Sequence, residues 1–160
     1  AAVVGRYVAP DAAVLDAGAG TGMLGDELAK LGFSNMDAND LSPGMLDRAR
    51  GKGIYENCRV MELGQPLDYA DDSYDAVVAC GVFTPNHAPA SSLDEMVRIT
   101  KPQGLIIYTL RGDEMPADFP PKHDELTDAG TWTLVEACSP FSSIASEPQI
   151  RHQCWVFRVL

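Results

Sequence analysis

A glycine-rich turn, Asp16-Ala17-Gly18-Ala19-Gly20-Thr21-Gly22, constrains this chain more than any other feature. The apolar pair Val14-Leu15 precedes the turn. After it, apolar side chains recur at helical spacing, at Met23, Leu24, Leu28 and Leu31. A strand that runs through alternating glycines into a helix lets the backbone approach a ligand closely, because glycine has no side chain in the way. The sequence therefore predicts a strand, a ligand-binding turn and a helix within residues 14–31.

The same turn has two competing interpretations. One is a tight strand-to-helix connection that binds nothing. The other is a dinucleotide fingerprint, Gly-x-Gly-x-x-Gly, which needs its third glycine where Met23 stands, so a nicotinamide oxidoreductase is disfavoured. Asp16 lies two residues before the first glycine, where it can meet a cation or orient donors. An acid at this position has little use beside a pyrophosphate.

Strand-like and helix-like segments alternate from Val14 to about Thr109, which is typical of an α/β domain. We expect strands at 14–15, 33–39, 58–61, 74–80 and 105–109, and helices at 23–31, 42–52 and 91–99. A turn at 101–104 precedes the fifth strand. Prolines then break regular structure from Pro116 to Pro121, and a short helix follows at 122–129. Two last strands, at 132–138 and 154–160, are joined by a loop and pair antiparallel at one sheet edge.

Length and charge limit the class of protein. A chain of 160 residues predicts a single domain, 1–160. Twelve Lys and Arg against 23 Asp and Glu give a net charge of −11, which repels nucleic-acid and lipid phosphates. With neither a long apolar run nor a secretory signal in the sequence, we expect a cytoplasmic protein without autonomous nucleic-acid or membrane binding. The opening residues AAVVGRYVAP resemble the end of an apolar helix, so we expect the native N-terminal helix to be incomplete.

Cysteine and histidine positions give little support for a metal site, and none is expected. The four cysteines are widely spaced and are interpreted as buried, reduced thiols: Cys58, Cys80, Cys138 and Cys154. His87 follows the fourth strand and is either a general base or, as favoured, a solvated loop residue. His123 and His152 receive no role. The segment Arg111-Gly112-Asp113 is either a substrate contact or, as favoured, an ordinary charged turn.

Four segments together resemble class I S-adenosylmethionine-dependent methyltransferases. They are Val14 to Gly22, Asn39 to Leu46, Ser73 to Val78 and Ile99 to Leu105. Asp40, in the second segment, stands eighteen residues after Gly22. The resemblance spans nearly the whole chain. A narrower one, to the Williams-Beuren syndrome region methyltransferase-like proteins, is carried by residues 18–22, 42–43, 48–53, 63–65 and 98–104.

The resemblance implies a Rossmann-like three-layer sandwich. Its sheet is seven-stranded and mostly parallel, in the order 3-2-1-4-5-7-6, with strand 7 antiparallel. The cofactor would be S-adenosylmethionine, with S-adenosylhomocysteine as product, lying across the carboxyl ends of strands 1, 2 and 4. Carried over by position, the cofactor contacts fall on Asp16, Gly18, Ala19, Gly20, Thr21, Gly22, Asp40, Leu41, Met45, Leu63, Gly64, Cys80 and Gly81.

The resemblance assigns each of these residues to one part of the cofactor. The backbone of 18–22 would line the methionine moiety, and Asp16 would help hold its ammonium group. Asp40 would accept from both ribose hydroxyls, although taken alone it is equally a helix-capping or solvated acid. Leu41 and Met45 would cover the adenine, with residues 63–64 at its edge and residues 80–81 near the sulfonium. Taken alone, Cys80 is more readily interpreted as a core residue, and Met45 is likewise a plausible core residue of an amphipathic helix.

Two positions depart from the family pattern. Many members carry an aspartate where Leu63 stands, which would accept from the adenine amino group. Gln103 replaces a glycine of the family's Leu-Lys-Pro-Gly-Gly turn. After the first departure, the contact with the adenine amino group must come from the backbone or be lost, whereas the second bears only on backbone conformation.

The function that the resemblance implies is methyl transfer to an unidentified acceptor. Residues 80–83, Cys-Gly-Val-Phe, replace the Asn/Asp-Pro-Pro-aromatic signature used on amino groups of bases, so a small molecule or a protein is favoured as acceptor. Displacement at a sulfonium needs mainly alignment, and no catalytic residue is assigned. The alternative is a catalytically silent cofactor-binding or interaction module. The oligomeric state stays open.

Overall fold

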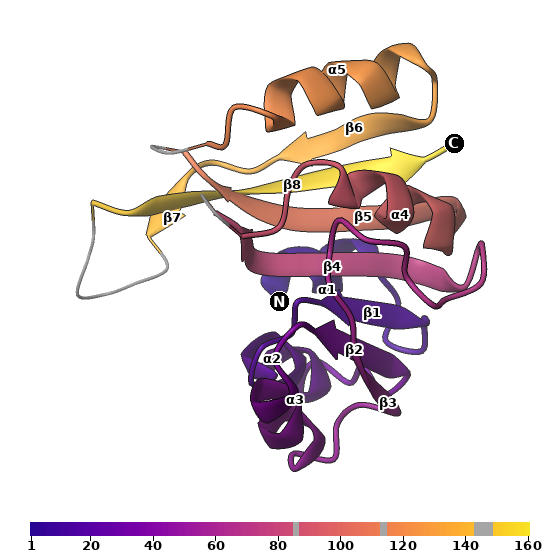
Figure 1. Cartoon of the computed structure of the whole chain (residues 1–160), viewed down its shortest axis with the longest axis vertical. Helices are drawn as coiled ribbons and strands as arrows, with labels where there is room; N and C mark the ends of the chain where they lie inside the picture. The colour runs from indigo at the N-terminus through magenta and orange to yellow at the C-terminus, as the bar shows by residue number, and fades with distance from the viewer. Residues whose placement is uncertain (85–86, 113–114, 143–148) are drawn as a thin grey trace.

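The computed structural model describes residues 1–84, 87–112, 115–142 and 149–160 (Figure 1). Positions 85–86 beside His87, position 113 of the charged turn and positions 143–148 of the last loop lie outside these described residues. The elements are α1 (Ala2–Tyr7), β1 (Val14–Ala17), α2 (Met23–Lys30), β2 (Met36–Asp40), α3 (Pro43–Arg50), β3 (Asn57–Val60), β4 (Tyr74–Phe83), α4 (Ser92–Ile99), β5 (Thr100–Arg111), α5 (Phe119–Asp128), β6 (Trp132–Ala137), β7 (Phe141–Ser142) and β8 (Arg151–Val159).

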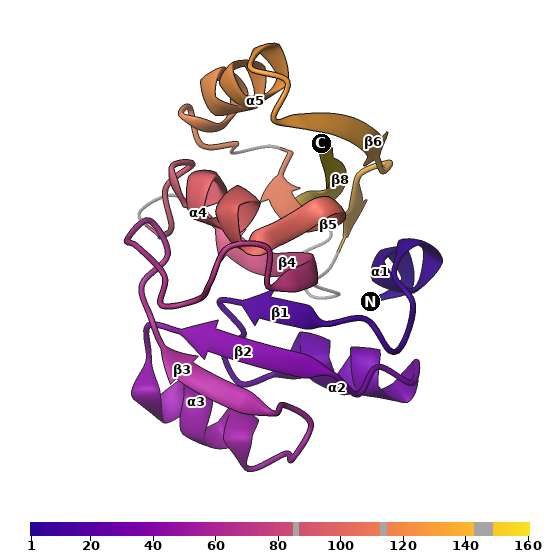
Figure 2. The same ribbon diagram turned by 90° about the vertical axis from the view of Figure 1, so that its right-hand side faces the viewer.

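The strands form one sheet in the order β3-β2-β1-β4-β5-β8-β6, which Figure 2 shows from bottom to top. The pairs from β3 to β5 are parallel, whereas β8 runs antiparallel to both β5 and β6. The two-residue β7 pairs with β8 beside this path and makes the sheet eight-stranded. Apart from β7, the order is the expected 3-2-1-4-5-7-6, with β8 as the antiparallel strand. The predicted α/β fold is confirmed.

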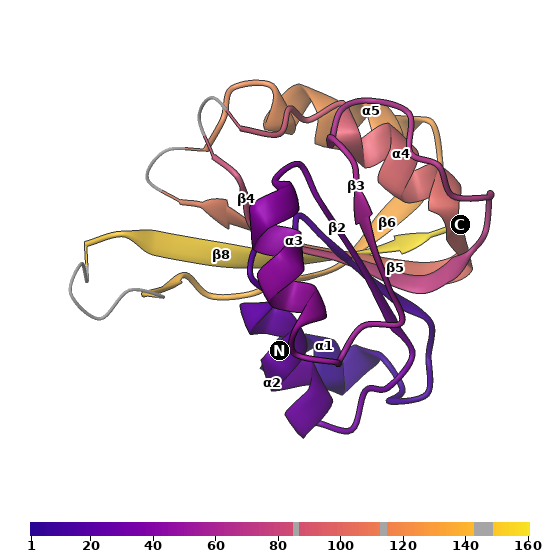
Figure 3. The same cartoon turned by 60° about the horizontal axis from the view of Figure 1, so that its bottom comes forward.

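Helices cover both faces of the sheet, with α1, α2 and α3 on one side and α4 and α5 on the other (Figure 3). Under α1 and α2, the apolar core includes Val4, Val8 and Leu28. The core under α4 and α5 is larger and richer in aromatic rings, with Trp132 stacked on Phe157 at 3.9 Å between ring centroids. The apolar runs of β4 and β5 are buried because both of their faces are covered.

Several boundaries differ from the sequence prediction. The turn expected at 101–104 lies inside β5 as a register shift, and Gln103 adopts a left-handed φ of 68°. Proline is expected to break structure up to 121, but α5 begins at Phe119, and Pro120 and Pro121 lie in its first turn, where their missing N–H groups cost no helical hydrogen bond. β8 starts at Arg151, so His152 lies in a strand rather than in a loop.

The described residues contain neither a membrane-spanning helix nor a metal-binding cluster. None of the helices in this part of the chain is long and apolar enough to cross a membrane. In the same ranges, no group of three His, Cys, Asp or Glu side chains could hold a metal ion.

Candidate functional site

The glycine turn forms an open loop at the carboxyl end of β1. Gly18, Gly20 and Gly22 have φ angles of 71°, 56° and 79°, in the left-handed region that glycine adopts without strain. At Gly18 space is limiting as well, because an added Cβ would lie 2.5 Å from Cγ2 of Val82. The end of β4 therefore packs directly on the loop, and both the conformation and the close approach require glycine at position 18.

Asp40 joins the end of β2 to the loop. Its Oδ2 accepts from the backbone N–H of Gly20 at 2.8 Å, and its Oδ1 accepts from the N–H of Ser42 at 2.9 Å. A carboxylate offers about four acceptor sites, so each oxygen can still accept from a hydroxyl group. Asp40 is half-buried, so part of the residue stays accessible to a ligand. Ser42 caps α3 as expected, its hydroxyl accepting from the N–H of Met45 at 3.4 Å.

Asn39 is a loop anchor that sequence reasoning missed. It is fully buried, and its side-chain Oδ1 accepts from the N–H of Gly18 at 3.1 Å, while its backbone carbonyl accepts from the N–H of Ala19 at 2.9 Å. Together with Asp40, it satisfies three consecutive N–H groups of the loop. The signal for this role in the sequence is an amide side chain next to an acid at the end of a predicted strand.

Asp16 is a buried carboxylate beneath the loop, with only 2% of its surface exposed. Burial raises the pKa of this carboxyl to about 6; the hydrogen bond from Tyr55 opposes the rise, and the charge of Asp40 adds to it. Tyr55 Oη donates to Oδ2 of Asp16 at 2.6 Å. At neutral pH the group carries a negative charge in a poorly solvated place, which a ligand cation would stabilise.

Tyr55 is the second residue that the sequence analysis missed. Its ring crosses the first turn of α2, where a Cβ added to Gly22 would lie 3.0 Å from Cε2 and one added to Gly25 only 2.1 Å from Oη. Glycine is unfavourable in the interior of a helix. In the sequence, Gly25 within the predicted helix is therefore the signal that another side chain approaches the helix backbone closely. The two glycines make room for the phenol to reach Asp16.

Large apolar side chains near the loop face solvent. Leu41 is 63% exposed and Met45 48% exposed, so the interpretation of Met45 as a core residue was wrong. Met45 lies beside the loop, since its Sδ would be 3.8 Å from a Cβ on Gly20. These side chains offer apolar surface to a flat ligand that lies against the loop.

The remaining predicted contacts lie on two segments. Gly81 follows Cys80 in β4, and its N–H donates to Oγ1 of Thr109 at 2.9 Å, one residue before Val82 reaches the loop. Cys80 is exposed, so its interpretation as a core residue was wrong.

The second segment is 63–64. Leu63 is buried, and Gly64 packs against Pro89, whose Cγ would lie 2.7 Å from an added Cβ. Among the described residues, no backbone hydrogen bond joins 63–64 to the glycine loop.

The other chemistry-bearing residues contribute little to the loop. All four cysteines are free, but only Cys154 is buried, so the expectation of buried thiols holds for that residue alone. His87 is exposed, and its Nδ1 lies 2.7 Å from Oγ1 of Thr84. His123 lies in α5 against Tyr108 and several other aromatic rings, and burial lowers its pKa. Gly112, at the end of β5, bonds to the backbone of β8.

Known proteins were compared with this chain. A family model described as "Methyltransferase domain" matches residues 15–108, more than half of the chain. Human methyltransferase-like protein 27 is 33% identical over 126 residues, covering 76% of this chain and 51% of that protein. Demethylmenaquinone methyltransferase from Corynebacterium glutamicum is 38% identical over 97 residues, covering 61% of this chain and 40% of that protein. The chain thus spans about half, or less, of the length of these relatives.

A solved structure shows the same fold. An S-adenosylmethionine-dependent methyltransferase from Methanosarcina mazei superposes with a TM-score of 0.79 at 16% identity, covering 99% of this chain and 97% of that one. The human relative is itself named a methyltransferase-like protein, in keeping with the narrower resemblance. By the family match and the fold, the chain belongs to the class I S-adenosylmethionine-dependent methyltransferases.

Proposed function

We propose that this chain binds S-adenosylmethionine at the glycine loop and transfers its methyl group to a small-molecule acceptor. The observation that carries the proposal is the position of Asp40, which holds Gly20 through one oxygen and Ser42 through the other. Each of its oxygens can accept a further hydrogen bond, and a vicinal diol is a fitting donor pair for the two.

The other side chains around the loop fit the parts of this cofactor. The buried Asp16 offers its negative charge to an ammonium group, and Tyr55 orients that carboxylate. The exposed Leu41 and Met45 offer apolar cover to a purine. Leu63 provides no side-chain acceptor, so the purine amino group would bond to backbone carbonyls or to water. The residues present fit the group in charge and in polarity.

Bound S-adenosylmethionine supplies a methyl group on a positively charged sulfur, which is a good leaving group. The task of the chain is then to hold an acceptor in line with that bond, and alignment of this kind supplies roughly 7–11 kcal/mol of barrier reduction. Asn39 and Asp40 contribute by fixing the loop before the ligand arrives, and Tyr55 orients the Asp16 carboxylate. We assign no general base, since one is required only for an acceptor that must lose a proton.

A small-molecule acceptor is favoured over nucleic acid on two grounds. The net charge of −11 opposes the approach of a phosphate backbone. The corynebacterial relative is named for a small quinone-type acceptor, demethylmenaquinone. A protein acceptor with a basic segment is the second choice.

Calorimetric titration with S-adenosylmethionine and S-adenosylhomocysteine, with NADH as the control ligand, tests cofactor binding. We expect selective binding of the first two. Asp40→Ala should weaken that binding by at least tenfold, since it removes a charged acceptor and a loop anchor. Asp47→Ala, an exposed acid on α3, is the matched control and should bind as the native chain does. Full affinity in Asp40→Ala, or preference for NADH, would overturn the proposal.

A second measurement separates an enzyme from a silent binding module. Radiolabelled methyl transfer should be followed across quinols, phenols, amines and a basic peptide. We expect turnover on at least one small acceptor. Cofactor binding without transfer to any of these acceptors would favour the silent module.

A further inference from the structure

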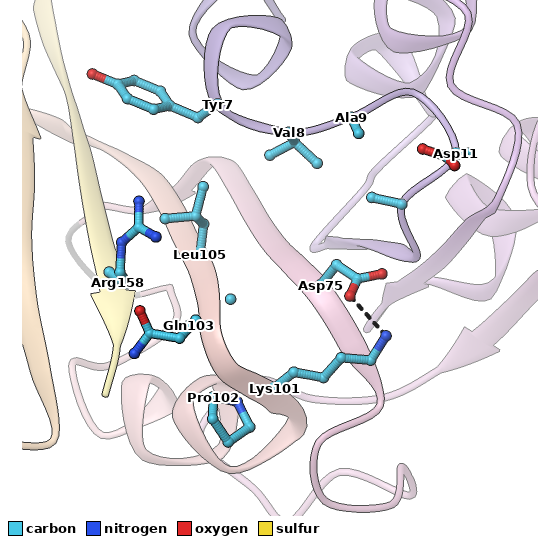
Figure 4. A pocket seen from close by; sticks show the side chains of 12 residues that line it. Tyr7, Val8, Ala9, Asp11, Asp75, Lys101, Pro102, Gln103, Leu105 and Arg158 are labelled. Carbon is cyan, nitrogen blue, oxygen red and sulfur yellow. Dashed lines mark hydrogen bonds and ion pairs between the residues drawn. The ribbon is translucent and has the colours of Figure 1, made fainter.

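A hollow of about 520 Å³ lies at the opposite end of the sheet from the glycine loop. It is bounded by the segment that follows α1, by the beginnings of β4 and β5, and by the end of β8, as Figure 4 shows. Ligand pockets commonly have volumes of about 300–1,000 Å³, so the hollow is large enough for a small metabolite. Because β1, β4 and β5 are parallel, their amino ends are a full strand length away from the glycine loop.

Arg158 is the unexplained charge in this hollow. Its backbone is fixed between Leu105 of β5 and Thr133 of β6, and its side chain is half-buried. Alternation along β8 places Arg158 on the same face as Val156, whose neighbours belong to the core under α1. Within the described part of the chain, its guanidinium has no hydrogen-bond, ion-pair or ring partner. A guanidinium that lines a hollow without a protein acceptor is available to a ligand that supplies one.

The other cation of the hollow is already neutralised. Lys101 Nζ lies 2.7 Å from Oδ1 of Asp75, and Asp75 Oδ2 accepts from the N–H of Ala13 at 2.8 Å. The lining contains two cationic and two acidic side chains in all. The formal charges of the lining therefore sum to zero. A ligand with one negative charge can bind at Arg158, whereas a ligand with several negative charges is repelled by the acidic side chains.

Gln103 places a second donor beside Arg158. Figure 4 shows both side chains on the same side of the hollow, facing the pair of Lys101 and Asp75. Gln103 holds a φ of 68°, which costs a residue other than glycine on the order of 1 kcal/mol. Strain of this kind persists where the side chain has a use. The apolar side chains of Val8 and Leu105 line the space between these polar groups.

We propose that this hollow binds a small organic monocarboxylate with an apolar body. The guanidinium of Arg158 would take the carboxylate through two parallel hydrogen bonds, and the Gln103 amide would donate a third. Val8 and Leu105 would contact the apolar body. The site is independent of the proposed cofactor site.

Binding can be followed by NMR on the ¹⁵N-labelled chain. The probes are hexanoate, its neutral analogue hexanamide, and inorganic phosphate. We expect hexanoate to shift the amide signals of Gln103 and Leu105, while hexanamide and phosphate bind at least tenfold more weakly. Equal binding of hexanamide, or of phosphate, would overturn the proposal.

Variants identify the groups that bind. Arg158→Gln should weaken hexanoate binding on the order of tenfold, whereas Arg48→Gln, an exposed arginine on α3, should leave it unchanged. Gln103→Gly removes a donor but relieves the left-handed strain, so we expect a higher melting temperature together with hexanoate binding weakened a few-fold. This variant decides the question even if Arg158→Gln fails to fold. Unchanged hexanoate affinity in Gln103→Gly and in folded Arg158→Gln would refute the site, and S-adenosylmethionine affinity should be native in both.

Discussion

The phenol of Tyr55 donates a hydrogen bond of 2.6 Å to the carboxylate of Asp16, across 39 residues of sequence. The contact links the segment after α3 to the end of β1, directly beneath the glycine loop. Because Asp16 is almost fully buried, Tyr55 replaces water as its donor. The proposed cofactor site therefore depends on a residue that no local motif contains.

Replacing Tyr55 with Phe tests this dependence. The hydrogen bond from Tyr55 opposes the rise in the pKa of Asp16, so its loss should move that pKa above the native value of about 6. An ammonium group needs the ionised carboxylate. We therefore expect the variant to bind S-adenosylmethionine more weakly than the native chain at pH 6.5, with the difference shrinking by pH 8.5. Calorimetry across this range measures it.

Tyr7→Phe is the matched control for that series, since Tyr7 lies on α1 and donates to Glu136 instead. Its affinity for the cofactor should follow the native pH profile. An unchanged profile in Tyr55→Phe would show that Asp16 does not hold the cofactor through its charge.

Asp16→Asn should stabilise the fold at neutral pH while weakening cofactor binding. Burial raises the pKa of Asp16 from 3.8 to about 6, so the folded chain holds this proton more tightly than the unfolded chain. The resulting stability is complete below pH 3.8 and is lost as the pH rises through 6. Asparagine does not ionise, so Asp16→Asn does not lose this stability at pH 7.5. Its free energy of unfolding should then exceed that of the native chain by up to about 3 kcal/mol.

Urea denaturation at several pH values measures this gain. The advantage of Asp16→Asn should shrink toward pH 4, where the native carboxyl is protonated in the folded state. Asp37→Asn, a half-buried acid of β2, provides the comparison. An Asp16→Asn advantage that did not vary with pH would contradict the assigned cause.

The sheet order was predictable because its signals are local. The apolar runs of β4 and β5 identify central strands, and the glycine turn identifies β1 and its helix. The change of pattern after residue 130 indicates the antiparallel edge, where β8 inserts between β5 and β6. Side-chain periodicity and turn chemistry specify these features without reference to distant residues.

The site was predictable only in part, because its polar contacts cross between elements. The role of Asp40 was implied by the family resemblance of its segment, but the roles of Asn39 and Tyr55 follow from which strands and loops lie side by side. Burial was also misjudged at Met45, which lies on the exposed side of α3, and at Cys80, which is exposed toward the carboxyl end of β4. The pocket beside Arg158 joins four separate segments and has no sequence motif.

Gly18→Ala should damage the loop for two separable reasons. Alanine at a φ of 71° costs about 1–2 kcal/mol, and its Cβ would lie 2.5 Å from Cγ2 of Val82. A double-mutant cycle with Val82→Ala separates the two costs. We expect Val82→Ala to recover the steric part in the double variant and to leave the backbone part. Strict additivity of the two free energies of unfolding would show that Val82 does not press on the loop.

The last prediction concerns how α1 is held on the sheet. Glu136 of β6 accepts from Arg6 at 2.9 Å and from Tyr7 at 2.6 Å, and these hydrogen bonds, that from Tyr7 above all, hold the pKa of Glu136 below its ordinary value. A six-residue helix is unstable in isolation, so α1 depends on this carboxylate and on the burial of Val4. We expect Glu136→Ala to speed hydrogen exchange in α1 while β5 and β8 keep native protection.

Lowering the pH should also speed hydrogen exchange in α1 of the native chain. The lowered pKa of Glu136 means that its contribution to stability is lost as the pH falls through that pKa. Glu27→Ala, which removes an exposed pair with Lys30, should leave α1 unchanged. Equal loss of protection in α1 and β5 would mean that Glu136 supports the whole fold rather than this helix.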